Sequence, residues 1–174
     1  NSNVATVIPQ STVIPRIPQT SAQKFTICQF TNSRDNTPKP VELTWEEFSR
    51  EFRQHPIRSS KDGHAWSPVS YIAGGLRKKE LVEKIFMAVL DVDSGIPVEE
   101  VLKHFDGYTY LAHSSYSHTQ DYPKFRVIVP FATPVPASEW ASVWSRFNQF
   151  SGNTNDVSVK DASRLYFTPG HPNE

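Results

Sequence analysis

The sequence predicts an α+β fold whose larger part is a β-α-β-β-α-β unit. Three observations support this prediction. Four apolar, strand-like segments follow residue 84, two segments with apolar residues at helical spacing separate them, and the second and third strands are joined without a helix. This order is that of ferredoxin-like and RNA-recognition-type folds. We expect residues 24–83 to form a smaller α/β lobe, residues 84–174 the RNA-recognition-type lobe, and residues 1–23 a flexible, proline-rich arm.

The smaller lobe begins with a predicted strand at residues 24–30, followed by turn-forming residues up to Pro40. A helix is expected in LTWEEFSREFRQHP, because Thr44 and Glu47 have the spacing of a capping box and Pro56 marks a stop. A polar loop then leads to a short apolar piece at residues 69–75.

The larger lobe begins with a predicted strand at residues 85–92. A helix follows in IPVEEVLKHFDG, where a proline suits the first turn and a glycine the end. The remaining elements are predicted strands at 108–114 and 124–131, a helix at 137–150, and a last strand at 164–168.

The composition limits the classes of function. The 174 residues have a formal net charge of zero, so nucleic acid or an anionic membrane would have to bind through a local patch. A single cysteine excludes an internal disulfide and fits a reducing, cytoplasmic location. No apolar run approaches the length of a membrane-spanning helix, so we expect no membrane association.

The predicted topology brings four polar segments to one edge of the sheet. Right-handed crossovers and the central hairpin give the spatial order 4-1-3-2, with neighbouring strands antiparallel. The ends of the first two strands and the starts of the last two then lie together. These places carry Asp91 and Asp93, SSYSHT (114–119), Lys124 and Arg126, and NDVSVKDASR (155–164).

Asp91 and Asp93 end an apolar strand and stand on the same face of it. Two carboxylates about 6–7 Å apart along a strand repel each other unless a cation lies between them. Mg²⁺ and Mn²⁺ prefer oxygen ligands, and a third acid from residues 155–161 would complete a two-metal site for phosphoryl transfer. The alternative is a pair of exposed acids at a junction between strand and turn.

Donors for an anionic ligand are predicted at the same edge. Arg126 stands within an apolar strand, where a buried guanidinium needs an anionic partner, either a nucleotide phosphate or Asp91 in a structural pair. Beside Ser115, Ser117 and Arg126, His118 is expected to contact a phosphate. The alternative is an ordinary histidine of a surface loop. The candidates for nucleotide binding are Ser115, Ser117, His118, Lys124, Arg126 and Arg164.

Over about residues 24–172 the sequence resembles the archaeo-eukaryotic primase superfamily, in particular the primase–polymerase domains of plasmids, phages and mobile elements. The resemblance implies a modified RNA-recognition-type core beside an N-terminal α/β unit. It is carried by KDGHAWSP (61–68), VLDVDSG (89–95), SSYSHTQDYPKFRVIVPF (114–131) and DVSVKDASRLYFTPGHP (156–172).

The resemblance also implies roles for the acids. Asp91 and Asp93 match the D-x-D metal pair of the family, and Asp156 matches the acid that supplies the third ligand. Asn155 precedes Asp156 where a hydrophobic residue is usual in the family, which keeps Asp161 as an alternative third ligand.

The serine-x-histidine element of the family, which binds the phosphates of the incoming nucleotide, is matched imperfectly. Tyr116 lies two residues before His118, so either Ser115 or Ser117 fills the place of the serine.

By this resemblance the chain is a nucleotidyltransferase, a DNA primase or DNA polymerase. A 3′-hydroxyl would attack the α-phosphorus of a nucleoside triphosphate and pyrophosphate would leave, with two Mg²⁺ or Mn²⁺ ions stabilising the developing charge. The implied partners are nucleoside triphosphates, a single-stranded or primed DNA template, and a helicase that is fused or separate. The implied location is cytoplasmic and associated with the nucleoid.

Two other functions compete with this one. VLDVDSG also resembles the nucleophile strand of haloacid-dehalogenase-type phosphohydrolases, in which Asp91 would form an aspartyl intermediate. That class has a parallel sheet with helical crossovers, whereas a hairpin is predicted here. The other alternative is a replication-initiator or nucleic-acid-binding module that keeps the fold without catalysis.

Overall fold

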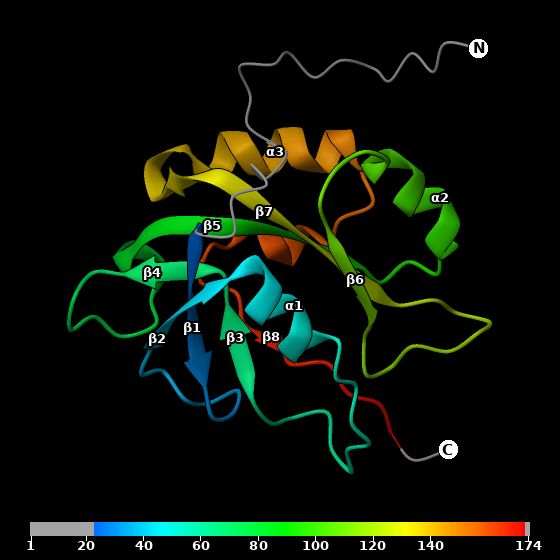
Figure 1. Cartoon of the computed structure of the whole chain (residues 1–174), viewed down its shortest axis with the longest axis horizontal. Helices are drawn as coiled ribbons and strands as arrows, with labels where there is room; N and C mark the ends of the chain where they lie inside the picture. The colour runs from blue at the N-terminus through cyan, green and yellow to red at the C-terminus, as the bar shows by residue number, and fades with distance from the viewer. Residues whose placement is uncertain (1–22, 173–174) are drawn as a thin grey trace.

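The computed structural model of the chain describes residues 23–172, which form two four-stranded antiparallel sheets and three α-helices (Figure 1). The expected arm lies outside the described residues except for Gln23. The side-chain Nε2 of Gln23 donates hydrogen bonds to the carbonyl groups of Phe131, at 3.1 Å, and Ala132, at 2.9 Å.

The elements follow the predicted order, with two additional short strands and one edge strand in the smaller lobe. Short 3₁₀ turns occupy Lys79–Leu81, Lys103–Phe105, Ala137–Glu139 and Val157–Lys160. The strands and helices are β1 (Lys24–Phe30), β2 (Lys39–Thr44), α1 (Trp45–Phe52), β3 (Ala65–Ser67), β4 (Val69–Tyr71), β5 (Val82–Val92), α2 (Val98–Leu102), β6 (Leu111–Ser114), β7 (Phe125–Pro136), α3 (Trp140–Phe150) and β8 (Tyr166–Phe167).

The α+β class is confirmed, but the predicted position of the last strand is wrong. The sheets have the orders β2-β1-β3-β8 and β4-β5-β7-β6. The last strand, β8, was expected beside β5, yet it pairs with β3, where Trp66 lies opposite Tyr166. The place beside β5 belongs to β4, because only Pro68 separates β3 from β4 and the chain crosses there from one sheet to the other.

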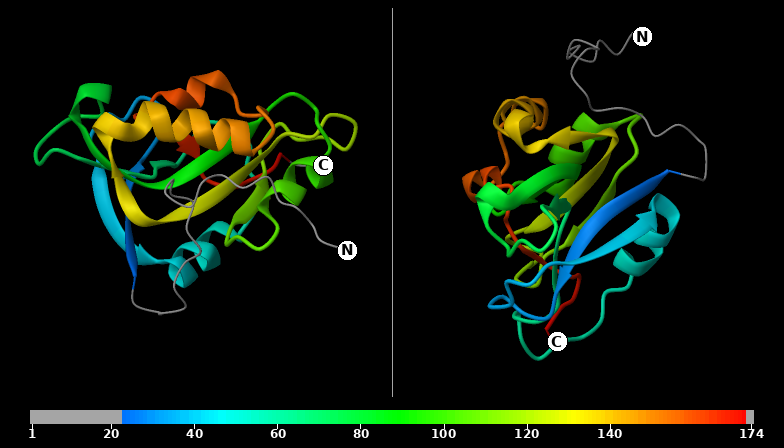
Figure 2. Two further views of the ribbon diagram at one scale, coloured as in Figure 1. Left: turned by 90° about the horizontal axis from the view of Figure 1, so that it is seen from above. Right: turned by 90° about the vertical axis from the view of Figure 1, so that its left-hand side faces the viewer.

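Sheet membership therefore crosses the expected lobe boundary at residues 83 and 84. β4 precedes the boundary but belongs to the sheet of β5, and β8 follows it but belongs to the sheet of β1. The two sheets lie against each other, and α3 covers the side of β5 and β7 away from β1 (Figure 2). The strands β4 and β7 flank β5 and both run antiparallel to it, which disagrees with the parallel sheet of the dehalogenase alternative.

The helix α1 has the capping box predicted from its sequence. The hydroxyl of Thr44 accepts a hydrogen bond from the backbone N–H of Glu47, and the carboxylate of Glu47 accepts one from the N–H of Thr44. Phe48 and Phe52, both buried, pack edge-on against Trp66 of β3. Among residues 23–172, no helix is long and apolar enough to cross a membrane.

A single core joins the two sheets, and β5 runs through it, since Ile85 and all residues from Met87 to Val92 are buried. Trp144 and Phe147 of α3 pack into this core. A small separate cluster holds Cys28, whose thiol pKa is raised to about 11 by burial.

Candidate functional site

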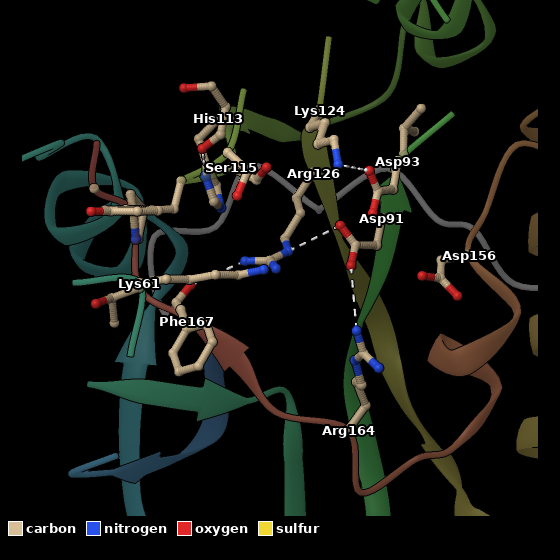
Figure 3. A pocket seen from close by; sticks show the side chains of 17 residues that line it. Lys61, Asp91, Asp93, His113, Ser115, Lys124, Arg126, Asp156, Arg164 and Phe167 are labelled. Atoms are coloured by element: carbon tan, nitrogen blue, oxygen red, sulfur yellow. Dashed lines mark hydrogen bonds and ion pairs between the residues drawn. The ribbon is translucent and has the colours of Figure 1, made fainter. Parts of the chain in front are cut away.

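A pocket lies where the ends of β5, β6 and β7 meet the chain on both sides of β8 (Figure 3). Eight of the nine predicted site residues line it, so the structure brings these distant segments together at one place. The eight are Asp91, Asp93, Ser115, Ser117, Lys124, Arg126, Asp156 and Arg164.

Arg126 pairs with Asp91 in the floor of the pocket. The two residues lie opposite each other on β7 and β5, and the Arg126 Nε donates to the Asp91 Oδ1 at 3.2 Å. Both are buried, with exposed fractions of 9% and 7%. A second donor of the guanidinium reaches the carbonyl group of Phe167 at 3.2 Å. Of the two partners that the sequence left open for Arg126, the structure therefore shows Asp91.

Two further cations face the acids from other sides of the pocket (Figure 3). The Arg164 guanidinium lies 3.9 Å from the Asp91 Oδ2, and the Lys124 ammonium lies 2.6 Å from the Asp93 Oδ1. The hydrogen bond to Asp93 raises the pKa of Lys124. Both cations are partly exposed, with side-chain exposures of 36% for Arg164 and 28% for Lys124.

Asp156 is attached directly to the end of β5. Its backbone N–H donates to the carbonyl group of Asp91 at 2.9 Å. Its Oδ1 accepts hydrogen bonds from the backbone N–H and the hydroxyl of Ser158, both at 2.8 Å, and the backbone bond is the main cause that lowers the pKa of Asp156. Asp161 makes the same two bonds with Ser163 but does not line the pocket.

The three acids of the pocket suit a hard divalent cation in kind, because carboxylate oxygens are the ligands that Mg²⁺ and Mn²⁺ prefer. Asp91, Asp93 and Asp156 each keep an Oδ2 atom that makes no hydrogen bond with any described residue. Their present partners are basic side chains and Ser158, and within residues 23–172 no three His, Cys, Asp or Glu side chains are gathered as a metal site. A cation would therefore replace the two more exposed basic partners, Arg164 and Lys124.

His118 is the predicted site residue that does not line the pocket. Its backbone N–H bonds to the carbonyl group of Ser115 at 3.1 Å and closes a turn. Its Nδ1 accepts a hydrogen bond from the backbone N–H of Lys124 at 3.1 Å. His118 thus joins the two ends of the β6–β7 connection, one through its backbone and the other through its imidazole.

The histidine that does line the pocket is His113 on β6, opposite Arg126 of β7. Its Nδ1 lies 2.8 Å from the carbonyl group of Ser114, so Nδ1 carries the proton and Nε2 is an acceptor that no described residue satisfies. Burial, and then the charges of Arg126 and His55, lower the pKa of His113 to about 4. Sequence reasoning missed this residue because its importance depends on the strand register.

Lys61 also lines the pocket. From the sequence it could belong either to a basic surface for template or nucleotide or to a solvated charged loop. It belongs to the loop between α1 and β3. Arg58 anchors this loop, since its guanidinium donates to the carbonyl groups of Thr168, at 3.1 Å, and Lys61, at 3.3 Å. The signal available in the sequence was the stretch KDGHAWSP, which carried part of the resemblance.

Comparison with known proteins gives one family and one solved structure. The family model described as the VapE N-terminal domain matches residues 68–174. The solved structure is the AEP domain of a primase–polymerase from cyanophage S-2L, with a TM-score of 0.45 and 14% identity over 86% of this chain and 75% of that chain. This TM-score is too low for the activity of that protein to be carried over. No curated protein matches the sequence significantly.

Proposed function

The chain belongs to the VapE N-terminal domain family, which is associated with phage and plasmid replication, and from this premise we propose that it is a template-directed nucleotidyltransferase. The proposed substrates are nucleoside triphosphates and a single-stranded or primed DNA template, and a fused or separate helicase is a proposed partner. The observation that carries the proposal is one pocket lined by three acids and four basic side chains, together with hydroxyl groups and a neutral histidine.

The charges of the pocket complement a nucleoside triphosphate bound with a cation. Arg126 would stay in place, because both Asp91 and the carbonyl group of Phe167 hold it. Arg164 and Lys124, which are more exposed, would turn from the acids to the phosphates. Ser115 and Ser117 would add hydroxyl donors at the same wall.

His113 would take a different part, because it is neutral near pH 7. Its Nε2 is an unsatisfied, buried acceptor without charge, so His113 would not hold a phosphate as the basic side chains would. Asp91, Asp93 and Asp156 are the residues that would hold Mg²⁺ or Mn²⁺. Such ions, when bound, supply Lewis-acid stabilisation of the charge that develops on the phosphate.

Incorporation of a labelled nucleotide on primed and unprimed templates, with Mn²⁺, tests this proposal. We expect incorporation by the wild type and its loss in Asp156→Asn. Asp161→Asn is the matched control, because it neutralises a carboxylate that accepts the same two hydrogen bonds from a serine two residues later, outside the pocket. Equal loss in both variants, or incorporation that survives Asp156→Asn, would contradict the assigned role of Asp156.

The same protein and templates distinguish the proposed transferase from the two alternative functions. Template binding by the wild type without any incorporation, under conditions in which the protein is folded, would refute the transferase proposal in favour of a nucleic-acid-binding module. Phosphate release from a small phosphoester with a trapped aspartyl adduct would refute it in favour of a phosphohydrolase.

A further inference from the structure

One edge of β5 has no strand beside it at its C-terminal end. β4 pairs with β5 only over Val82 to Ile85, and within residues 23–172 no strand pairs with this edge further along. The N–H and C=O groups of Asp91 point to this edge and bond there. In a buried strand such groups need partners, since an unsatisfied peptide group is costly.

The side chain of Asn155 provides the partner of the Asp91 N–H and a partner for the C=O of Val89 on the same edge. Its Oδ1 accepts a hydrogen bond from the N–H of Asp91 at 2.9 Å, and its Nδ2 donates to the carbonyl group of Val89 at 3.4 Å. The N–H of Asp156 continues the series with its bond to the carbonyl group of Asp91 at 2.9 Å. A carboxamide presents a donor and an acceptor side by side, as a peptide group does. Asn155 therefore makes the hydrogen bonds that a neighbouring strand would make at this edge.

Asn155 is itself held from the other side. It is 7% exposed, and its backbone N–H donates to the Oδ1 of Asn148 on α3 at 3.1 Å. The carbonyl group of Asn148 accepts a further bond, at 2.8 Å, from the N–H of Asn153. The segment before Asp156 is therefore clamped between α3 and β5, which leaves the Asn155 side chain little freedom to turn.

We propose that Asn155 is a positioning residue that sets the place of the Asp156 carboxylate beside Asp91. This inference rests on the proposed function, in which the two acids act on the same cation. An apolar side chain of similar size would leave the N–H of Asp91 and the C=O of Val89 without partners, and the segment of Asp156 would separate from β5.

Amide hydrogen exchange tests the placement independently of any ligand. In Asn155→Leu we expect the amide of Asp156 to exchange at least about tenfold faster, while amides in the middle of β7 keep their protection. The control is Val101→Ala, which shortens a buried side chain of α2 away from the pocket. Unchanged protection of Asp156 in Asn155→Leu would overturn the proposal.

Mn²⁺ titration without nucleotide tests whether the placement of Asp156 by Asn155 affects the affinity for the cation. A residue that orients a ligand rather than binding the ion contributes about 10- to 100-fold to affinity, so Asn155→Leu should weaken Mn²⁺ binding by at least about tenfold. Because Asn155 acts through Asp156, the same change in an Asp156→Ala background should cause no further loss. Persistent loss in that background, or equal loss in Val101→Ala, would refute a positioning role.

The two proposals fail in different ways. A wild type that neither binds Mn²⁺ nor incorporates nucleotides refutes the proposed function, and the role of Asn155 toward a cation falls with it. The exchange of the Asp156 amide then still decides whether Asn155 holds Asp156 against β5. Binding and incorporation by the wild type, with no change in Asn155→Leu, refutes the positioning role alone.

Discussion

His113 is expected to make the fold sensitive to mild acid. It lies in the pocket wall with its pKa lowered to about 4, first by burial and then by the charges of Arg126 and His55. The hydrogen bond to the carbonyl group of Ser114 opposes this shift. Protonation of His113 in the folded protein therefore places a second positive charge beside Arg126, its cross-strand neighbour.

The sign and size of the effect follow from proton linkage. The unfolded chain binds a proton on this histidine near pH 6.5, whereas the folded protein does so near pH 4. Between these values the unfolded state holds more protons, so stability rises with pH and falls on acidification. The full difference corresponds to about 3 kcal/mol, of which about 2 kcal/mol would be lost at about pH 5.

Urea unfolding of the wild type and His113→Gln at about pH 7.5 and about pH 5 measures this effect. We expect the variant to be the less stable protein at the higher pH, because a packed ring is lost. The gap in unfolding free energy should narrow by about 2 kcal/mol at the lower pH, since glutamine does not titrate. His64→Gln, at an exposed position, is the control. A gap that does not change with pH would refute the reasoning.

Three other changes have expected outcomes, each measured by urea or thermal unfolding. Asp91→Ala leaves the buried Arg126 without its carboxylate and should lower the unfolding free energy by about 3–5 kcal/mol, so a smaller loss than about 1 kcal/mol would contradict the pairing. Thr44→Ala removes the capping box of α1 and should lower the unfolding free energy by about 1 kcal/mol, whereas Thr44→Ser should largely keep it. Gly170→Ala would place a Cβ 2.4 Å from the Cδ of Arg58 and should cost about 1–3 kcal/mol, so an unchanged unfolding free energy would contradict this contact.

The elements that could be predicted from the sequence are those with local signals. Thr44 and Glu47 predict the start of α1, and the apolar run before Asp91 predicts β5. β2 was not predicted, because Pro40 within it is a residue type that is typical of turns. In the structure β2 is an edge strand, where a residue without an N–H group is tolerated.

The partner of β8 could not be predicted, because pairing between distant strands is decided by packing in three dimensions. Tyr166 alternates with its neighbours as a strand residue should, but this pattern is the same in either sheet. The packing of Tyr166 on Trp66 and beneath the Arg126 guanidinium is compatible only with the sheet of β3.

Eight of the nine candidate residues lie together in the structure, but residues 155–164 reach the pocket through the bond of Asp156 to Asp91 and not through the expected pairing of the last strand with β5. Which histidine faces the pocket was not predictable. The turn that begins at Ser115 directs His118 to the backbone of Lys124, and the register of β6 with β7 places His113 opposite Arg126. The first detail depends on the geometry of a turn and the second on strand register, and neither is evident from the residue types alone.

The buried position of Cys28 has a practical consequence for experiments on this protein. It is the single cysteine of the chain, and its protonated thiol is inaccessible to alkylating reagents near neutral pH. A cysteine introduced at an exposed position such as Lys78 would therefore be the one group that a maleimide dye labels. Fluorescent or spin-labelled protein could be prepared in this way without first removing a native thiol.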